Sequence, residues 1–212
     1  MDDTRQVEDR LRAEYVGLRP AMQRALTALM TEVNYVLLPA ILKLDRYEQI
    51  VVKGRVKDSE SAVDSLRRRQ ESRSFADPAA SYSLTTLPDL IGIRVLAFPQ
   101  RRVKDARDLL EADPRLNLWQ RDHISSPDPT QPPVAFKYQG RLNPSDPFRS
   151  ELQIVSSLIG SFWEIEHSAI YKPTPELLGV ARSDEMKDRN DAVLIALQRF
   201  EQQFDRQIES SD

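Results

Sequence analysis

The sequence contains no cysteine among its 212 residues. Disulfide bonds and thiolate metal ligands are therefore excluded, and a reducing, intracellular location is the expectation that fits. A long apolar run is missing too, because the longest apolar stretch, residues 35–44, contains Pro39 and is too short to cross a bilayer. The acidic, polar first ten residues do not resemble a signal peptide. These absences favour a cytoplasmic protein without a membrane partner.

An excess of charge of one sign is also absent. The 30 basic residues face 33 acidic residues, which gives a formal net charge of −3. No global field would attract nucleic acid or membranes, so an anion-binding site must be local. The length suffices for one domain with a full core. We expect one compact domain, made of an N-terminal helical segment over 1–47, a core over 48–175 and a C-terminal helix over 176–212.

Apolar periodicity predicts the order of helices and strands. Residues 4–46 repeat apolar side chains every three or four positions, which predicts helix broken near Pro20 and Pro39. Strands are expected over 49–57, 87–98, 117–124, 134–142 and 150–156, and helices over 59–72, 101–112, 157–170 and 184–208. This order predicts an α/β fold in which terminal helices pack around a mixed sheet of about five strands.

A local excess of positive charge occurs over residues 53–73, where seven basic side chains meet four acidic ones. Three cations alternate along the expected strand and point to one side, namely Lys53, Arg55 and Lys57. The next helix, with Ser59 as its expected N-cap, places on one face Ser61, Ser65 and Arg68. Strand cations beside a helix N-terminus suit phosphate oxygens. The alternative is a solvated basic helix face, and the alternating strand cations favour the phosphate site.

Two acidic residues begin separate expected strands. Asp89 precedes the apolar run "LIGIRVLAF", and Glu151 alternates with core-facing Leu152. If the strands are neighbours, the two carboxylates converge at one end of the sheet. Mg²⁺ prefers such oxygen ligands and keeps substrate phosphates in its shell. Taken singly, Asp89 is interpreted as a cap at the start of a strand and Glu151 as a surface acid, so only their joint placement favours a metal site.

Five motifs occur in order and at compatible spacing: "GRVKDSES", "LPDLIGIRV", "RDHI", "ELQIVS" and "FWEIEHSAIYK". Together they resemble the synthetase domain of the RelA/SpoT family, especially the small stand-alone alarmone synthetases, over residues 50–172. The resemblance implies a nucleotidyltransferase-like fold. It also implies transfer of pyrophosphate from ATP to the 3′-hydroxyl of GDP or GTP, with Mg²⁺ as the cofactor.

The resemblance implies roles for individual residues. ATP phosphates would be held by Arg55, Lys57 and Ser61, to which the basic cluster adds Lys53 and Arg68. Asp89 and Glu151 would be the catalytic pair that binds magnesium, and Glu151 would also help to deprotonate the acceptor hydroxyl. The residues expected to bind the acceptor are Arg94, Phe136, Tyr138, Gln153, Glu166 and His167. The two aromatic residues are alternatives for the tyrosine that stacks on the acceptor base in the family.

The sequence departs from the family pattern in three places. The family's phosphate-binding lysine falls on Ser65, for which Arg68 is the expected substitute, and its arginine after E-x-Q-x falls on Val155. The acceptor signature G-Y-x-S-x-H, preceded by P-K, is missing. A proline-rich loop over 125–133 and the segment "VAFKYQGRL" stand in its place. The donor and metal half is thus partly kept, and the acceptor half is rewritten or lost.

Two functions remain open on the sequence. The first is a divergent pyrophosphokinase whose acceptor is a nucleotide or, as in toxin-like members of the family, the 3′ end of tRNA. The second is a catalytically inactive binding or regulatory module. Asp89 and Glu151 favour the enzyme, because a scaffold has no need of two convergent acids, whereas the missing motifs favour the module. An antitoxin protein or a second copy of the chain is a further expected partner.

Overall fold

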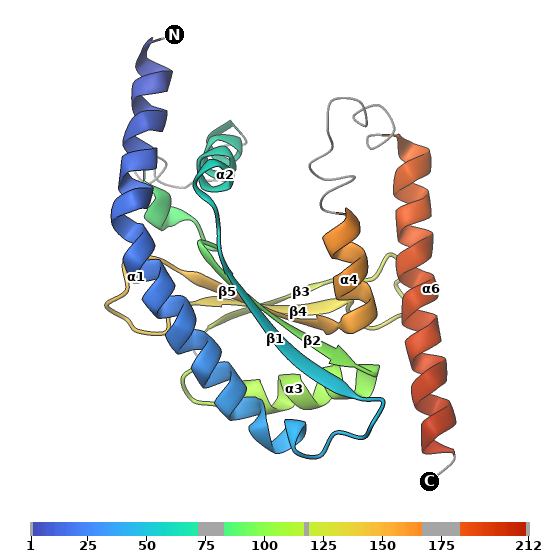
Figure 1. The fold of residues 1–212 in the computed structure, drawn as a ribbon. Coiled ribbons are helices and arrows are strands. Elements are labelled where there is room, and N and C mark those ends of the chain that lie inside the picture. The colour runs from blue at the N-terminus through green and yellow to red at the C-terminus, as the bar shows by residue number, and fades with distance from the viewer. Residues whose placement is uncertain (1, 72–82, 117–118, 167–182, 211–212) are drawn as a thin grey trace.

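The computed structural model describes residues 2–71, 83–116, 119–166 and 183–210. Five strands form one sheet in the order β1-β2-β5-β4-β3 (Figure 1). The strands are β1 (Gln49–Val56), β2 (Ile91–Phe98), β3 (Gln120–Ile124), β4 (Ala135–Gly140) and β5 (Ser150–Ser156). The central strands β2 and β5 are parallel, and the other three pairings are antiparallel. The expected mixed five-stranded α/β sheet is confirmed.

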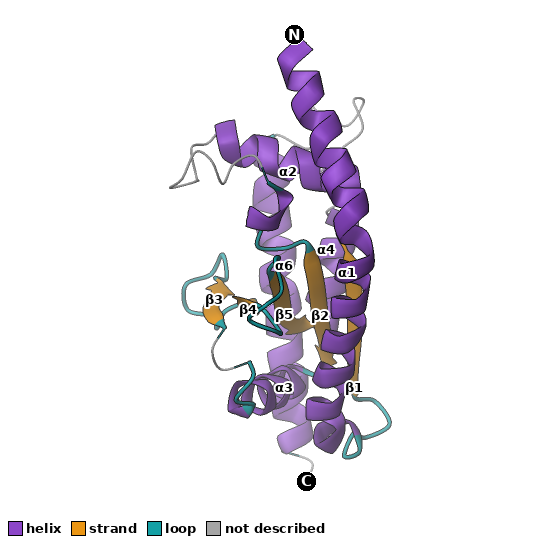
Figure 2. Cartoon of the chain, turned by 90° about the vertical axis from the view of Figure 1, so that its left-hand side faces the viewer, coloured by secondary structure: helices purple, strands orange, loops and turns teal. Residues whose placement is uncertain are grey.

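Helices cover both faces of this sheet (Figures 1 and 2). They are α1 (Asp2–Ile41), α2 (Ser59–Glu71), α3 (Gln100–Ala112), α4 (Ser157–Glu166) and α6 (Asp184–Glu209), with a short 3-10 helix at Leu84–Thr86. α1 and α3 pack on one face, and α4 and α6 pack on the other. In the part of the chain that is described, no helix is both long and apolar enough to pass through a membrane.

Strand alternation gives the two faces of the sheet different character. The face toward α1 and α3 carries the main hydrophobic core, to which the strands contribute Ile91, Ile93, Val95, Leu152 and Ile154. A second, smaller core lies under α4 and α6 and contains Leu96, Ala135, Val155, Ile159 and Leu194. This smaller core covers only part of its face, because the neighbouring strand positions are polar. The uncovered polar part of that face is where a site can form.

The expected break of the first helix near Pro20 and Pro39 is wrong. α1 is continuous from Asp2 to Ile41 and includes both prolines. Each proline removes one backbone hydrogen bond, but both lie on the exposed side of the helix, where water can satisfy the freed carbonyl groups. The opposite side carries an unbroken buried stripe, Met22, Leu26, Leu29, Val33 and Leu37. Packing of this stripe holds the helix together despite the prolines.

Two boundaries near the expected site also differ from the sequence analysis. β2 begins at Ile91 rather than at residue 87, so Asp89 lies in the turn before the strand instead of within it. The N-cap of α2 is Asp58 rather than Ser59, because the Asp58 side chain accepts a hydrogen bond from the Ser61 backbone N–H at 2.8 Å. An aspartate that directly precedes serine competes for the same capping position, and spacing alone does not decide between them.

Candidate functional site

Strand register aligns polar residues in two rows across the uncovered face. Residues that pair across neighbouring strands project from the same face of a sheet. One row runs Arg55, Gly92, Glu151, Gln139 and Gln120, from β1 to β3. The next row runs Lys53, Arg94, Gln153, Lys137 and Asp122. Lys53 and Arg55 project from the same side of β1, as expected. The segments that contain Asp89 and Glu151 are neighbours, because β2 pairs with β5.

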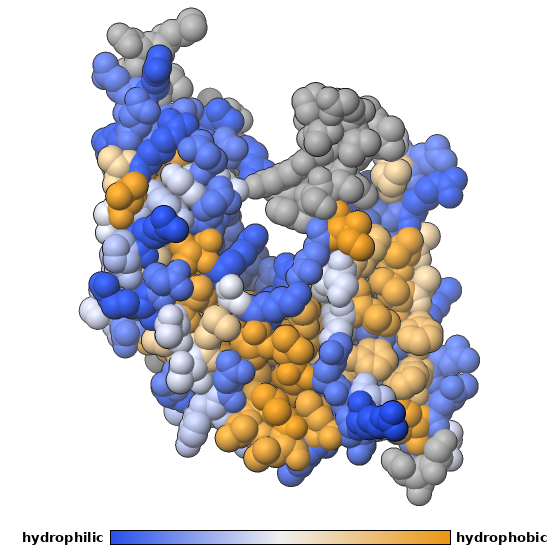
Figure 3. All heavy atoms as spheres, in the orientation of Figure 1, coloured by the Kyte–Doolittle hydropathy of each residue, from blue (hydrophilic) through white to orange (hydrophobic). Residues whose placement is uncertain are grey.

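The β1, β2 and β5 residues of these rows line two adjoining cavities, together called the polar cleft here. The larger cavity, about 600 Å³, lies against α2 and is lined by Lys57, Ser61, Ser65, Arg68 and Asp89, among others. The smaller cavity, about 280 Å³, contains Lys53, Gly92 and Glu151. The two cavities share four wall residues, Arg55, Arg94, Gln153 and Glu164. Figure 3 shows hydrophilic side chains around this hollow between α2 and α4.

The N-terminus of α2 opens toward the larger cavity. Asp58 caps it with its side chain and with its carbonyl group, which accepts from the Ala62 backbone N–H at 2.9 Å. Ser61, Ser65 and Arg68 all line this cavity, which confirms that they share one face of the helix. Ser65 is buried there. The N-terminus of α2 presents backbone N–H groups to the cavity, and Arg55 and Lys57 present positive charges beside them. Both kinds of group suit the binding of one anion.

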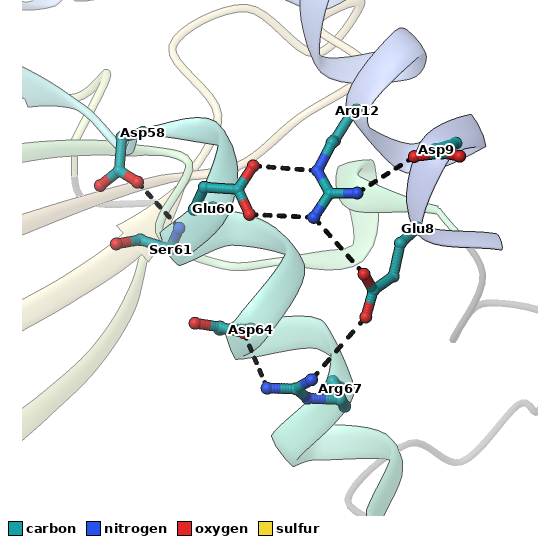
Figure 4. Close-up of polar contacts among 8 residues, drawn as sticks. All are labelled: Glu8, Asp9, Arg12, Asp58, Glu60, Ser61, Asp64 and Arg67. Atoms are coloured by element: carbon teal, nitrogen blue, oxygen red, sulfur yellow. Dashed lines mark hydrogen bonds and ion pairs between the residues drawn. The ribbon is translucent and has the colours of Figure 1, made fainter. Parts of the chain in front are cut away.

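Ion pairs with α1 fix the position of α2 (Figure 4). Arg12 donates two hydrogen bonds to the carboxylate of Glu60, at 2.9 and 3.0 Å. Glu8 links Arg12 at 3.4 Å and Arg67 at 3.7 Å. These contacts engage the side of α2 that faces away from the cleft. The opposite side, with its serines, remains directed into the larger cavity.

Asp89 lies at the bottom of the larger cavity beside a lysine. Its Oδ2 accepts a hydrogen bond from Lys57 Nζ at 2.5 Å, and both side chains are mostly buried. The other oxygen, Oδ1, is buried and has no hydrogen-bond partner among the described residues. A buried carboxylate oxygen without a partner is costly unless a ligand or ion satisfies it. Asp89 is therefore set up to receive a donor or a cation from within the cleft.

Glu151 is held by three donors. Its Oε2 accepts from Lys137 at 2.9 Å and from Gln139 at 3.1 Å, and its Oε1 accepts from Gln153 at 2.8 Å. Lys137 and Gln139 come from β4, where alternate residues face the cleft. The charge of Glu151 is thus balanced by Lys137. A metal ion that binds Glu151 has to displace or share this lysine contact.

Asp89 and Glu151 lie at the same end of two neighbouring strands without touching. Asp89 lies in the turn three residues before Gly92, the strand partner of Glu151. These two carboxylates would hold one oxygen-ligated ion between them. The described residues contain no cluster of three or more acids or histidines. The donor set therefore fits Mg²⁺, which completes its shell with substrate phosphates and waters.

Arg94 occupies the centre of the cleft. Its Nε donates to Gln153 Oε1 at 3.2 Å, and its guanidinium lies 6.0 Å from the ring centroid of Trp163. Burial, reinforced by the nearby charge of Arg55, lowers the pKa of Arg94 from its ordinary value. Burial and a neighbouring positive charge both disfavour the charged form of an arginine, and an anionic ligand would stabilise that form. Arg94 and Arg55 together give the shared wall of the cleft a positive charge that suits an anion.

Two acids from α4 border the cleft. Glu164 pairs with Lys53 at 3.0 Å, and Glu166 lines the larger cavity, where it accepts from Asn190 at 3.4 Å. Burial raises the pKa of Glu166 above its ordinary value, and the Asn190 hydrogen bond opposes this only in part. Among the described residues, Glu166 makes no ion pair with a cation of the polar cleft. His167, expected beside it, lies outside the described residues.

The expected placement of Phe136 and Tyr138 in the acceptor site is wrong. Both alternate with Lys137 and therefore lie on the opposite face of β4. Tyr138 is buried in the main core, and its hydroxyl donates to Glu111 at 2.7 Å. Burial and that acidic partner raise the pKa of Tyr138. The guanidinium of Arg107 lies 4.8 Å from the centroid of the Phe136 ring. Neither ring reaches the polar cleft.

The residues in or beside the cleft that the sequence analysis did not single out include Lys137, Gln139, Trp163 and Glu164. The signal for the first two was present, because strand alternation with Glu151 and Gln153 across an antiparallel pair selects every second residue of β4. Trp163 and Glu164 give no comparable signal. Their direction depends on how α4 packs on the sheet, which the sequence does not specify.

Comparisons with protein-family models and with curated proteins found no match. Solved structures do match. Small alarmone synthetase 1 from Bacillus subtilis, bound to its product pppGpp, is 16% identical, with a TM-score of 0.64 over 89% of this chain and 93% of that one. The same protein bound to AMPCPP gives 16% identity, a TM-score of 0.61 and coverages of 90% and 93%.

A GTP pyrophosphokinase family protein from Streptococcus pneumoniae is also similar. It is 22% identical to this chain, with a TM-score of 0.60 over 91% of this chain and 89% of that one. The similarity thus covers nearly the whole of each molecule. At these identities it establishes a common architecture rather than a common activity. The chain has the fold of the small alarmone synthetases.

Proposed function

We propose that the protein is an ATP-dependent pyrophosphokinase that transfers the pyrophosphoryl group of ATP to the 3′-hydroxyl of a nucleotide acceptor. The observation that carries this proposal is the polar cleft, in which cations of β1 and the α2 N-terminus surround Asp89 with its unpartnered buried oxygen. The fold adds support, because the similar structures named above include complexes with AMPCPP and with pppGpp.

The larger cavity is the proposed site of the ATP phosphates. Arg55, Lys57, Ser61 and Arg68 line it, and Lys53 borders the adjoining cavity. Cationic side chains provide charge-assisted hydrogen bonds to phosphate oxygens, and the α2 N-terminus adds backbone N–H groups. Lys57 is held by Asp89 at 2.5 Å and would be shared between that acid and a phosphate. In this proposal the β-phosphate of ATP would lie near Asp89.

Asp89 and Glu151 are the proposed ligands of Mg²⁺. When bound there, the ion would neutralise charge on the transferred group and polarise the attacking hydroxyl. The acceptor oxygen attacks the β-phosphorus as the bond from this phosphorus to the α,β-bridging oxygen breaks, and AMP leaves. Glu151 would take the hydroxyl proton, for which it has to give up hydrogen bonds that it now accepts.

The smaller cavity is the proposed acceptor site. Arg94 and Gln153 form its wall, and Glu166 lies at the far side of the larger cavity. Because Phe136 and Tyr138 face away, the aromatic side chain of the polar cleft among the described residues is Trp163, which lines the larger cavity and lies over Arg94, a residue that both cavities share. This change of aromatic group supports an acceptor that differs from GDP or GTP, including the 3′ end of tRNA.

Lys137 is predicted to compete with the metal ion for Glu151. Lys137→Met retains the apolar stem and removes the charge at 2.9 Å from Glu151, so we expect Mn²⁺ and Mg²⁺ to bind about tenfold more tightly, as measured by calorimetry without nucleotide. Lys53→Met is the matched control, because Lys53 is on the same face but pairs with Glu164. Equal affinities in Lys137→Met and the wild type would show that the lysine does not restrain the metal site.

An inactive binding module is the second candidate function, and two positions favour it. Ser65 is buried in the larger cavity without adding a charge, and Val155 is enclosed in the small core under α4 and α6. Both positions carry a cation in the resembled family. The module hypothesis expects nucleotide binding without transfer, whereas the enzyme hypothesis expects both.

A transfer assay separates these two functions. The full chain is incubated with ATP labelled in its β- and γ-phosphates, with Mg²⁺ and with GDP, GTP, ADP or bulk tRNA as acceptor. We expect label to move to at least one acceptor, with AMP released in equal amount. Omission of Mg²⁺ is the control. Label that stays in ATP with every acceptor would overturn the enzyme proposal, and light scattering of the same sample reports whether the chain associates with itself.

A further inference from the structure

A second cavity lies at the end of the sheet, where α3 meets α6. It has a volume of about 280 Å³ and is lined by residues of α3, β4, β5, α4, α6 and the proline-rich loop. It shares no lining residue with the polar cleft. The volume is nearly twice the roughly 150 Å³ of an apolar cavity that holds one benzene molecule. A flat bicyclic ring therefore fits it.

The floor of this second cavity carries two acids with unsatisfied oxygens. Glu201 is 1% exposed, and its Oε1 has no hydrogen-bond partner among the described residues. One turn further along α6, Asp205 accepts from the Arg101 backbone N–H at 2.9 Å through Oδ2, while its buried Oδ1 also lacks a partner. Residues four apart share one face of a helix, so both acids line the cavity together.

The raised pKa values of these two acids agree with carboxyl oxygens that lack hydrogen-bond donors. Burial raises the pKa of Glu201 to about 7, against a hydrogen bond from Ser156 and with the help of the Asp205 charge. Burial also raises the pKa of Asp205, which the Arg101 contacts oppose. Buried acidic oxygens without a partner are satisfied when a ligand presents N–H groups to them.

The walls and the rim of the second cavity carry aromatic, proline and basic side chains, in contrast to the two acids of the floor. Phe136, which the sequence analysis assigned to base stacking, lines this cavity instead, and Arg107 lies 4.8 Å from the ring centroid. Pro132 and Pro133 close the wall formed by the loop. At the rim, Lys104 is exposed and makes no ion pair with a described residue. From floor to rim, the cavity presents N–H acceptors, then an aromatic surface, then a cation.

We infer that this cavity binds a purine nucleoside monophosphate. The amino and ring N–H groups of the base would donate to Glu201 and Asp205, the ring would lie along Phe136 and the prolines, and the phosphate would meet Lys104. A divalent metal ion fits less well, because the wall is apolar and the described residues offer no third acidic or histidine ligand. The inference is independent of pyrophosphoryl transfer in the polar cleft.

The test is a calorimetric titration of the full chain with GMP, AMP and CMP, and with ribose 5-phosphate as a probe that lacks a base. We expect saturable binding of at least one purine monophosphate, weaker binding of CMP, and none of ribose 5-phosphate. Lys104→Ala and Phe136→Leu should each weaken purine binding about fivefold or more, and Glu201→Gln should alter the preference between GMP and AMP. Lys187→Ala on the exposed side of α6 is the matched control and should change nothing.

Arg55→Ala assigns the binding to one site or the other. A monophosphate held in the second cavity binds this variant as it binds the wild type, because Arg55 belongs to the polar cleft. Loss of binding in Arg55→Ala, with no change in Lys104→Ala and Phe136→Leu, would overturn the inference and leave the pyrophosphokinase proposal intact. The absence of saturable binding by any monophosphate would overturn it as well. Lys104 is exposed, so its variant is not expected to impair folding.

Discussion

Asp89→Asn is expected to reduce pyrophosphoryl transfer by roughly 10²–10⁴-fold, which corresponds to the several kcal/mol that a metal-bound carboxylate contributes to such a reaction. The asparagine has nearly the same shape but lacks the charge that would hold Mg²⁺ and balance Lys57. Glu151→Gln should show a comparable loss, since it removes both a metal ligand and the proposed proton acceptor. Initial rates with the acceptor identified by the transfer assay provide the measurement.

Asp64→Asn is the matched control for these variants. Asp64 is an exposed acid of α2 that pairs with Arg67 at 2.9 Å, outside both cavities of the polar cleft. Its rate should remain within about twofold of the wild type, and thermal melting of all three variants shows whether the fold is intact. Wild-type rates in both Asp89→Asn and Glu151→Gln would exclude the two acids from the chemistry.

Glu48→Gln is expected to destabilise the fold by about 3–5 kcal/mol, the cost of removing one partner from a buried ion pair. The Glu48 side chain is 0% exposed and binds Arg101 at 2.6 Å and Arg102 at 2.5 Å. It also accepts the Asp45 backbone N–H at 2.9 Å. These contacts join the chain before β1 to the start of α3. Denaturant unfolding of both proteins measures the difference, which is a large share of the stability of a typical domain.

The pH dependence of this effect has a definite sign. Burial alone would raise the pKa of Glu48, but hydrogen bonds from Arg102, the Asp45 backbone and Arg101 outweigh it, so the pKa lies below its ordinary value of 4.5. The carboxylate therefore stabilises the fold fully above pH 4.5, and this contribution is lost as the pH falls through the native pKa. The stability difference between wild type and Glu48→Gln should shrink in the same range.

Asp105→Asn is the control for the Glu48 prediction. Asp105 also pairs with Arg102, at 2.8 Å, but its side chain is 43% exposed. Such an exposed pair contributes about 0–1 kcal/mol, so the loss should be small. Equal losses in Glu48→Gln and Asp105→Asn would show that burial of Glu48 has little energetic importance.

Much of the fold and part of the site could be predicted from the sequence, because they depend on local periodicity. Strand alternation correctly placed Lys53 and Arg55 on one face of the sheet, and Glu151 and Leu152 on opposite faces. The helical spacing of Ser61 and Ser65 did the same for α2. These patterns follow from backbone geometry, which neighbouring elements do not alter.

Other features depend on packing between distant segments and could not be predicted. Pro20 would break an isolated helix, but the buried stripe of α1 keeps it continuous. The counter-ions of Asp89 and Glu151 come from other segments of the chain, and the position of Glu164 depends on the packing of α4. Phe136 differs from these cases, because its position next to Lys137 on β4 already places the two side chains on opposite faces of the sheet. Its aromatic character carries no information about which face it occupies.

Calorimetric titration of the wild-type chain with ATP, with and without Mg²⁺, tests most directly whether the polar cleft is a magnesium-dependent triphosphate site. We predict one ATP bound per chain, at least tenfold more weakly when Mg²⁺ is omitted or when Asp89 is replaced by asparagine. An ATP affinity that is the same with and without Mg²⁺, or no ATP binding at all, would contradict the account.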